Sequence, residues 1–318
     1  MFEKIIDMLN KSKRIGIFTH INPDGDALGS VYSLRDVLHR MGKMTEAYFC
    51  GSTEPRLVEI FGAQVSEVPP SECDFLIALD CAAKDRLGRF DVYFDNNPNT
   101  AAIDHHITHV PYAAERTVAD ISSNCELMYR LYREMKVSIS ADAARYLYVG
   151  IITDTGSFKY SSVKSDTLRT AAELLDIGVN SAALSKKIFD TKSRGYLKLY
   201  ARAIDKLEYY SDNRIAVLRL SEEDFNSCGT NEAEASAVVS LPRSVDGVEL
   251  GVYVRDRGDE CKVSLRASEK INAAKLAEAF GGGGHVAASG YSVKPAEAED
   301  NLRILIREAE RQLDLERV

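Results

Sequence analysis

The sequence has no surplus of basic residues and no long apolar run. Of its 318 residues, 48 are acidic and 40 are basic, so the formal charge is -8. Proteins that coat long nucleic acids are strongly basic, and we therefore expect no binding of long duplexes and only local contacts with any polyanion. The longest apolar stretches, such as YLYVGIIT at 146–153, are too short to cross a bilayer, so we expect no membrane segment.

The chain also lacks the sequence features of an exported protein. An acidic residue, Glu3, lies where a signal peptide needs a basic and then an apolar segment. The six cysteines form no CxxC pair and are too sparse for a disulfide framework in a chain of this length. We expect a cytoplasmic protein with reduced, mostly buried thiols.

The periodicity of the sequence predicts an α/β fold with two domains. Hydrophobic residues make up 45% and charged residues 28%, an ordinary balance for a globular chain, and the length exceeds that of one usual domain. Short β-type runs alternate with helical patterns in the first part of the chain, which predicts parallel strands crossed by helices. The β-type runs are 14–20, 44–49, 75–80 and 100–104, and the helical pattern between the first two is 26–42.

A second alternating region begins near residue 206, after a helical stretch from about 123 onward. Its β-type runs precede a glycine run at 281–284 and a charged helix at 295–313. We predict a domain at 1–190 with a mainly parallel sheet flanked by helices, a helical linker at 191–212, and a smaller α/β domain at 213–318.

Polar residues end the predicted strands of the first domain. His20, Asp80 and Asp104 each close an apolar run, and ligands of parallel sheets bind outside the carboxyl ends of the strands. The segment HINPDGD adds Asp24 and Asp26 in a tight turn. Taken alone, this segment is an acidic turn in which Asp26 caps the next helix, and Asp80 is equally open to a capping role.

The segment IDHH ends the third strand with Asp104, followed by His105 and His106. Adjacent side chains on an extended backbone point in opposite directions, so we expect the two histidines to have different roles. Asp154 follows an apolar helical segment, at a predicted helix end. Each of these features is weak alone, and a surface histidine pair is usually inert. Their convergence on one domain indicates a shared functional site.

The ends of these elements together supply four carboxylates and two imidazoles. Four clustered aspartates would repel one another, and their pKa values would rise unless divalent cations neutralised them. Imidazole ligands favour Mn²⁺ or a similar transition ion over Mg²⁺. Because two such ions can clamp a phosphoryl oxygen, phosphoester hydrolysis is the leading chemistry.

At these residues the sequence resembles the DHH phosphoesterase family. The matching segments are HINPDGD, the ALD strand end, the DHH triplet and TDTGSF, in the order of the family, while VSLRAS and FGGGGHVAASG resemble the DHHA1 domain of one branch. That branch contains the nano-RNases, which are bifunctional oligoribonucleases and phosphatases of 3′-phosphoadenosine 5′-phosphate (pAp). The resemblance implies Mn²⁺-dependent hydrolysis of very short oligoribonucleotides to mononucleotides, and removal of the 3′-phosphate of pAp to give AMP, in a cleft between the two domains.

The resemblance also implies a role for each residue of the first domain. Asp104 would orient the triplet, and His106 would face the scissile phosphate, where it could stabilise developing charge. The metal ligands would be His20 and Asp24 for one ion, Asp26, His105 and Asp154 for the other, and Asp80 as the bridge between them.

In the second domain, the resemblance implies substrate contacts by Arg266, Gly282, Gly283, Gly284 and His285. Glycines admit close backbone approach to an anion, and an arginine fork suits phosphate. Taken alone, a glycine run is more often a flexible loop and an edge arginine is commonly solvated. Arg255 and Lys262 stay unassigned, and for His39 and His109 we expect structural roles only.

Two alternatives stay open. A cyclic-dinucleotide or pApA phosphodiesterase would share both domains and the metal chemistry, and a non-catalytic nucleotide-binding module would keep the fold without the reaction. Such a module has no need of the clustered charge. Family II pyrophosphatases share the N-terminal motifs, but FGGGGH argues against them. The sequence leaves cleavage polarity, substrate length and a homodimer open.

Overall fold

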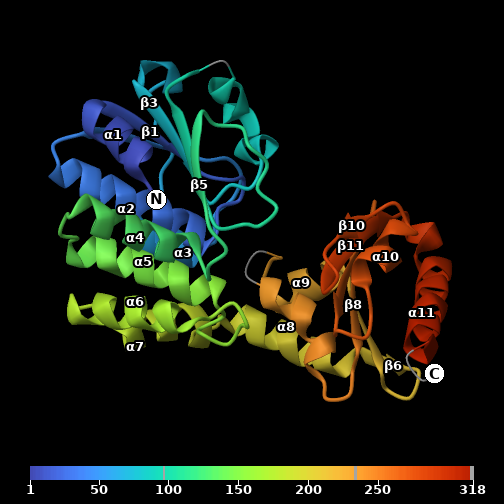
Figure 1. Cartoon of the computed structure of the whole chain (residues 1–318). Helices are drawn as coiled ribbons and strands as arrows, with labels where there is room; N and C mark the ends of the chain where they lie inside the picture. The colour runs from blue at the N-terminus through green and yellow to red at the C-terminus, as the bar shows by residue number, and fades with distance from the viewer. Residues whose placement is uncertain (96, 233–234, 316–318) are drawn as a thin grey trace. The chain divides into compact units, whose positions relative to one another are not determined.

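The computed structural model describes residues 1–95, 97–232 and 235–315 and is shown in Figure 1. The chain forms two compact units, Met1–Thr191 and Lys192–Val318, each with its own sheet. The predicted α/β class is confirmed for both. No helix in the described part of the chain is long and apolar enough to cross a bilayer.

The first unit contains a five-stranded sheet in which every neighbouring pair of strands is parallel. Its order is β2-β1-β3-β4-β5, and four of the strands fall on predicted runs. The short edge strand β5 was not predicted from the sequence. The strands are β1 (Arg14–Phe18), β2 (Met44–Tyr48), β3 (Phe75–Leu79), β4 (Thr100–Asp104) and β5 (Glu115–Val118).

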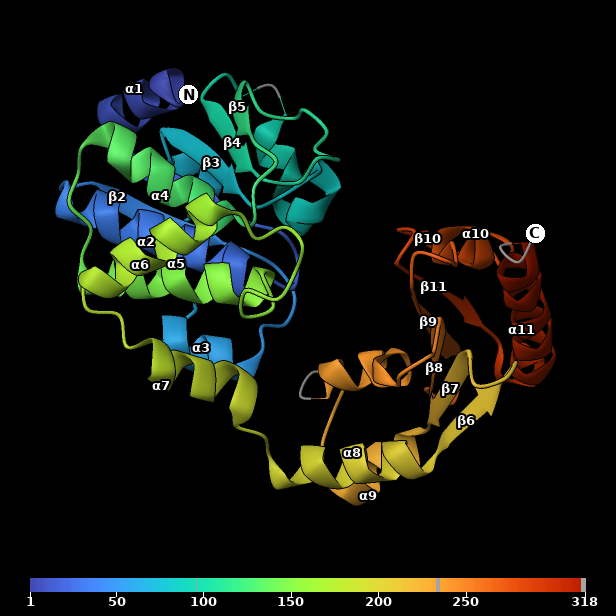
Figure 2. The ribbon, with the colours of Figure 1, turned by 60° about the horizontal axis from the view of Figure 1, so that its bottom comes forward.

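Both faces of this sheet are covered, which explains the continuous apolar runs. In β3, Phe75 and Ile77 pack against the main helical core, whereas Leu76 and Ala78 face the segment η2 (Lys84–Phe94). Figure 2 shows α4, α2, α5 and α6 lying together beside the sheet. The helices are α1 (Glu3–Lys11), α2 (Gly25–Arg40), α3 (Pro55–Phe61), α4 (Asn124–Met135), α5 (Ala141–Asp154), α6 (Ser165–Asp176) and α7 (Ser181–Ser185).

Two glycines allow α2 and α5 to pack closely. A Cβ atom at Gly29 would lie 2.6 Å from the carbonyl oxygen of Tyr146 in α5. A Cβ atom at Gly150 would lie 2.8 Å from Oδ1 of Asp26. The absence of both side chains therefore brings Asp26, near the start of α2, against the helix that ends at Asp154.

The second unit contains a six-stranded mixed sheet in the order β10-β11-β9-β8-β7-β6, in which only β7 and β8 pair in parallel. The segment 191–212, expected as a linker, holds α8 and β6 of this unit. The strands are β6 (Leu207–Tyr210), β7 (Ile215–Leu220), β8 (Leu250–Asp256), β9 (Cys261–Ala267), β10 (Gly283–Gly284) and β11 (Ala288–Val293).

Helices cover both faces of the second sheet as well. Leu302, Leu305 and Ala309 of α11 recur at helical spacing and pack with α10 on one face, and α8 and α9 pack on the other. The helices are α8 (Arg194–Asp205), α9 (Glu222–Cys228), α10 (Ala273–Glu278) and α11 (Ala298–Leu315). Short single turns of helix are η1 (Pro70–Glu72), η3 (Lys186–Asp190), η4 (Ser236–Ser240), η5 (Pro242–Ser244) and η6 (Pro295–Glu297).

Candidate active site

The carboxyl ends of β1, β3 and β4 surround a cavity of about 160 Å³ in the first unit. His20 follows β1, Asp80 follows β3 directly, and the two histidines of the triplet follow β4. The start of α2 and the end of α5 close the remaining sides. We call it the metal-ligand cavity because several of its side chains are the predicted metal ligands. It is lined by His20, Asp24, Asp80, Ala82, Arg86, His105, His106 and Asp154.

The ligand atoms around the cavity form three groups, and within each group they lie within 4.8 Å of one another. Asp80 and His105 each belong to two groups, so the groups are contiguous. The structure thus brings together all six residues predicted as metal ligands, and it adds His106 to the set. The groups are His20, Asp24 and Asp80; Asp26, His105 and Asp154; and Asp80, His105 and His106.

Asp80 has the properties of a side chain built to bind a cation. Its backbone has φ +53°, in the left-handed region that costs a non-glycine residue about 1–3 kcal/mol. The side chain is only 3% exposed, and its Oδ1 atom accepts no hydrogen bond from the described residues. A buried carboxylate oxygen without a donor is unfavourable, and a divalent ion would satisfy it.

The two predicted imidazole ligands present the same ring nitrogen to the carboxylates. Nδ1 of His20 lies 2.9 Å from the carbonyl oxygen of Ile21, and Nδ1 of His105 lies 3.1 Å from that of Ile121. A carbonyl oxygen only accepts, so each Nδ1 carries a proton, and Nε2 is the nitrogen that can offer a lone pair to a metal ion. Nε2 of His105 lies 3.4 Å from Asp80 Oδ1. Metal-binding histidines are commonly oriented by such carbonyls.

Helix N-termini hold Asp24 and Asp26, and here one expectation is wrong. The cap of α2 is Asp24, whose Oδ1 atom accepts from the backbone N–H groups of Asp26 and Ala27, both at 3.0 Å. Asp26 instead accepts from the N–H groups of Asn124 at 2.6 Å and Cys125 at 2.8 Å, at the start of α4. Each carboxylate oxygen retains a lone pair for a ligand.

Burial and crowding alter the acidity of this cluster. Burial, followed by repulsion from a neighbouring aspartate, raises the pKa of Asp26 and of Asp154 to about 7. Burial lowers the pKa of the His105 imidazole, but the carboxylates of Asp80, Asp26 and Asp154 outweigh it and raise that pKa to about 10. A cation among these groups would replace protons and restore the negative charge of the ligands. The donor set of carboxylates and imidazoles therefore fits divalent transition ions.

The DHH triplet is organised by the fully buried carboxylate of Asp104. Its Oδ1 atom accepts from Nδ1 of His106 at 2.8 Å, and its Oδ2 atom accepts from Nδ1 of His109 at 2.7 Å. Burial alone would raise the pKa of Asp104, but these two hydrogen bonds hold it below its usual range. With Nδ1 engaged, Nε2 is the nitrogen that His106 has available in the cavity.

The expectation that His105 and His106 point in opposite directions is wrong. Their ring centroids are 4.5 Å apart, and both rings approach Asp80, at 3.4 Å for His105 and 3.6 Å for His106. The reason is that β4 ends at Asp104, so the alternation of an extended strand does not continue into the histidines.

Two residues near the site have contacts that the sequence does not reveal. His109 is buried, in agreement with the structural role expected for it, and its Nδ1 donates to the triplet aspartate Asp104. Arg86 belongs to none of the predicted site residues, and it lines the cavity from η2. His109 lies five residues after Asp104, and this closeness in sequence is a feature that could have indicated their contact. Nothing in the local pattern distinguishes Arg86 from other exposed arginines.

The predicted substrate residues of the second unit gather around the β10–β11 hairpin. Arg266 of β9 pairs with Ala288 of β11, and the backbones of His285 and Ala288 hydrogen-bond to each other across the turn. The second half of the glycine run, Gly283–Gly284, therefore forms a short strand paired with β11. A Cβ atom at Gly282 would lie 2.2 Å from the carbonyl oxygen of Gly290, so hairpin packing already requires this glycine.

The remaining glycines of the run differ from one another. Gly284 has φ +142°, and a Cβ atom there would lie 2.6 Å from Ser289, whereas a Cβ atom at Gly283 would meet nothing within 4 Å. Of the three glycines predicted to contact the substrate, only Gly283 thus has open space for a ligand. The side chain of His285 is exposed beside it.

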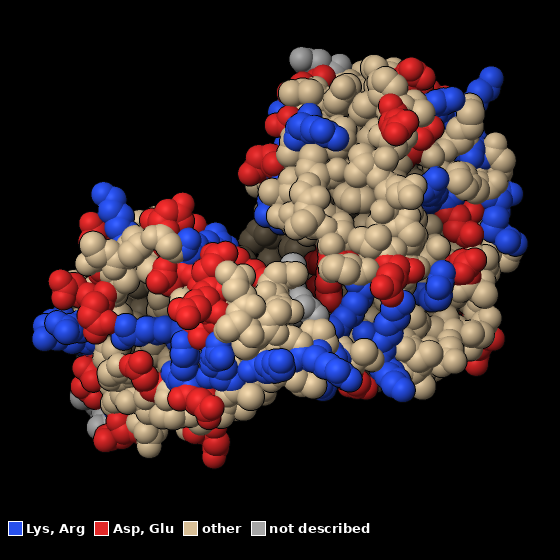
Figure 3. Space-filling view, turned by 180° about the vertical axis from the view of Figure 1, so that it is seen from behind, with Lys and Arg blue, Asp and Glu red and all other residues tan. Residues whose placement is uncertain are grey.

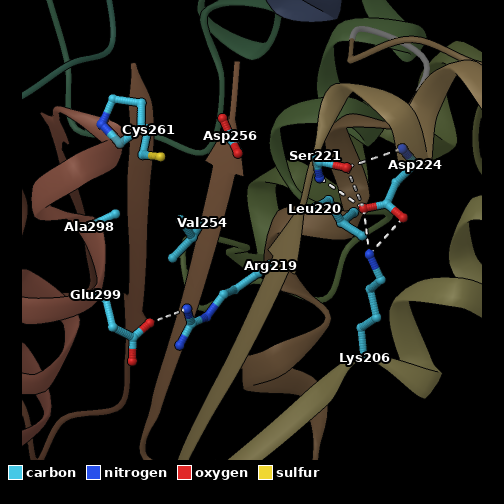
Figure 4. Close-up of a pocket in the computed structure, with 11 residues that line it drawn as sticks. Lys206, Arg219, Leu220, Ser221, Asp224, Val254, Asp256, Cys261, Ala298 and Glu299 are labelled. Carbon is cyan, nitrogen blue, oxygen red and sulfur yellow. Dashed lines mark hydrogen bonds and ion pairs between the residues drawn. The ribbon is translucent and has the colours of Figure 1, made fainter. Parts of the chain in front are cut away.

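Charge elsewhere on the chain is mostly balanced locally. A cavity of about 290 Å³ in the second unit is lined by both signs, and Figure 4 shows Lys206 directed at Asp224 and Arg219 directed at Glu299. Lys206 Nζ lies 2.6 Å from Asp224 Oδ2, and Arg219 Nη1 lies 2.5 Å from Glu299 Oε2. On the face seen in Figure 3, acidic and basic side chains are interspersed. The metal-ligand cavity differs because its carboxylates pair with imidazoles and, within the described residues, with no lysine or arginine.

Comparison with known proteins identifies two family domains in the chain. The DHH family, N-terminal domain, matches residues 14–151, and the DHHA1 domain matches residues 212–312. The bifunctional oligoribonuclease and PAP phosphatase NrnA of Thermus thermophilus is 32% identical over 288 residues, which cover 88% of this chain and 84% of the relative.

Solved structures share the fold. An exopolyphosphatase-related protein of Bacteroides fragilis superimposes with a TM-score of 0.90 at 25% identity, covering 98% of this chain and 97% of that one. The exonuclease RecJ bound to manganese has a TM-score of 0.60 at 13% identity, covering 98% and 94%. From its family matches and its similarity to NrnA, this chain belongs to the DHH family and carries a DHHA1 domain in its second unit.

Proposed function

We propose that this chain is a metal-dependent phosphoesterase that hydrolyses very short oligoribonucleotides to mononucleotides and removes the 3′-phosphate of pAp. The observation that carries the proposal is the cluster of carboxylates and imidazoles around Asp80, whose buried Oδ1 atom has no donor among the described residues. The name of the Thermus thermophilus relative supports the same pair of activities.

The cofactors in this proposal are two divalent ions, with Mn²⁺ favoured by the imidazole ligands. His20 and Asp24 would hold one ion, Asp26, His105 and Asp154 the other, and Asp80 would contact both; the ligand groups support this division. When bound, such ions polarise a phosphoryl oxygen and lower the pKa of water. The manganese named for the RecJ structure is in line with the proposed metal.

One active site serves both substrates because the same bond is cut. In a dinucleotide such as pApA and in pAp alike, a water oxygen forms a bond to phosphorus and the bond from phosphorus to O3′ breaks. The leaving O3′ then needs a proton. Asp104 holds Nδ1 of His106 at 2.8 Å, which orients the ring and leaves Nε2 for the substrate. His106 is our candidate for stabilising charge on the phosphoryl group and for protonating O3′.

The nucleotide part of the substrate would contact the second unit. Among the described residues, the Arg266 side chain has no carboxylate within 4 Å and makes a single hydrogen bond, from Nη1 to the carbonyl oxygen of Leu265. Gly283 leaves its backbone approachable, and His285 is exposed. These three residues are the proposed contacts. A reducing, cytoplasmic location is part of the proposal and agrees with six free cysteines.

The test is a comparison of substrates with and without metal. The full chain would be incubated with pApA, pAp, cyclic di-AMP, pyrophosphate and an RNA of about 20 nucleotides, in Mn²⁺ and in excess chelator. We expect rapid release of AMP from pApA and pAp, slow turnover of the others, and loss of all activity in chelator. Short RNA labelled separately at each end would give the polarity of cleavage from the order of products.

Each alternative has its own outcome. Faster hydrolysis of cyclic di-AMP than of pApA would replace the proposal with a cyclic-dinucleotide phosphodiesterase. Binding of the nucleotides without turnover would favour a non-catalytic module, and undiminished activity in chelator would contradict the metal-dependent reaction.

A further inference from the structure

Arg86 is the only lysine or arginine among the residues that line the metal-ligand cavity. It lies on η2, which follows β3 and its terminal Asp80. Its side chain is exposed, and within the described part of the chain no carboxylate lies within ion-pair distance of its guanidinium group. The cavity therefore has a cation on its wall whose charge is not consumed by a salt bridge.

The other cations of η2 have partners within the protein. Lys84 lies 2.5 Å from the carboxylate of Asp95, and the guanidinium carbon of Arg89 lies 4.9 Å from the centroid of the Phe90 ring. Arg86 has neither kind of partner in the described residues. A charge left free beside a metal site is suited to an anionic substrate, since charged arginine forks bind phosphate through two parallel hydrogen bonds.

The backbone of Arg86 is anchored to the loop that carries His20. Its carbonyl oxygen accepts from the N–H group of Ile21 at 2.8 Å, and its own N–H donates to the carbonyl oxygen of Ala83 at 3.1 Å. Gly88 has φ +60°, and a Cβ atom there would lie 2.9 Å from the side chain of Ile21. The start of the side chain is thus held in place while the guanidinium group stays free, an arrangement that favours preorganised binding.

The charge balance of the site indicates which substrate needs Arg86 most. Four carboxylates and two divalent ions sum to no net charge when the site is filled as proposed. A phosphodiester brings one negative charge, whereas the terminal 3′-phosphate of pAp brings about two. A further positive charge on the wall therefore contributes more to the phosphomonoester reaction than to the diester reaction.

We propose that Arg86 binds a non-bridging oxygen of the reacting phosphate and is the residue that gives this site its phosphomonoesterase activity. This inference rests on the proposed function, because it assigns the reacting phosphate to the metal-ligand cavity. The bond changes are those already described; the role of Arg86 is electrostatic, and it neither gives up nor takes a proton.

The test uses Arg86→Ala and Arg86→Lys, with Arg89→Ala as the matched control on the same segment. We expect Arg86→Ala to lower kcat/KM about 100-fold for pAp and about tenfold for pApA. Arg86→Lys keeps the charge but loses the fork, so it should recover part of the loss. Arg89→Ala should stay within twofold of the unaltered chain for both substrates.

Binding gives a readout independent of turnover. Calorimetric titration of inorganic phosphate into the Mn²⁺-loaded protein should show weaker binding in Arg86→Ala, whereas the rise in unfolding temperature caused by Mn²⁺ should be the same as in the unaltered chain. Equal losses on pAp and pApA, unchanged kinetics, or loss of Mn²⁺ stabilisation would each overturn the inference. Absence of hydrolysis by the unaltered chain would instead contradict the proposed function.

Discussion

The metal-ligand cavity of the first unit and the cavity beside Lys206 in the second unit differ in how their charges are arranged. In the second unit, Asp224 and Glu299 each contact a cation, within a cavity of about 290 Å³. In the first unit, a smaller cavity of about 160 Å³ gathers several carboxylates whose ion-pair partners among the described residues are all imidazoles. Buried charge of one sign is costly to maintain, so this arrangement marks a site of chemistry better than cavity size does.

Removal of one carboxylate from each cavity should have the largest effect and tests the difference between them most directly. We expect Asp80→Asn to lower kcat more than about 100-fold, because the change removes the charge shared by two ligand groups. Asp224→Asn should leave kcat within twofold. Hydrolysis of pApA in Mn²⁺ measures both. Equal losses in the two variants would show that the cavities do not differ in the way described.

The stabilisation of the protein by bound metal should depend on pH, because the ligands of the first cavity titrate near neutral pH. Asp26 and Asp154 have a pKa of about 7 in the folded protein against an ordinary value of 3.8. Between these values the folded protein binds more protons than the unfolded chain, so the metal-free stability contributed by these groups falls as pH rises from about 4 to 7. Divalent ions bind the ionised form, so their stabilisation grows over the same range.

At a free Mn²⁺ concentration about 100 times Kd, one site stabilises the protein by about 2.7 kcal/mol. We expect thermal unfolding to show a larger Mn²⁺-induced rise at pH 7.5 than at pH 5, and no such rise in Asp80→Asn. A rise that is equal at both pH values would contradict the role assigned to the ionised carboxylates.

In the second unit, an aspartate-to-asparagine substitution should lower the stability of the protein. Asp224 is buried and accepts from the backbone N–H of Ser221 at 2.8 Å, which caps α9, and from Lys206. Asp224→Asn weakens both interactions and should cost about 2 kcal/mol of unfolding free energy in urea. Glu223→Gln, at the exposed neighbouring position, is the control and should stay within about 0.5 kcal/mol. An equally small loss at 224 would refute a structural role for the paired charges.

The smallest expected effect concerns the orientation of the triplet. His109→Ala removes one of the hydrogen bonds to Asp104 and leaves His106 in place. We expect kcat to fall about tenfold, with KM for pApA and the Mn²⁺-induced stabilisation unchanged. His109→Gln, which can still donate, should restore part of kcat. A fall in Mn²⁺ affinity would show that His109 supports the ligands and not the triplet.

Much of this site was predictable because each predicted ligand lies at the end of a strand or helix that local periodicity reveals. His20, Asp80 and Asp154 follow apolar runs, and such runs identify their elements. The capping of α2 was assigned to the wrong aspartate because Asp24 and Asp26 both fit the turn, and only the backbone of α4 decides between them. Arg86 could not be identified from the sequence. Its lack of an ion-pair partner among the described residues depends on which side chains the fold places around it.

The sequence by itself determined the α/β class, most of the strands, the identity of the charged residues and the family resemblance, since these depend on periodicity and on local motifs. Only the tertiary structure decided which ring nitrogens face the carboxylates, that His109 supports Asp104, and that Arg86 lines the cavity. Those facts depend on contacts between residues far apart in the chain. A hydrogen bond or an unpaired charge exists only once packing has set the distances between its groups.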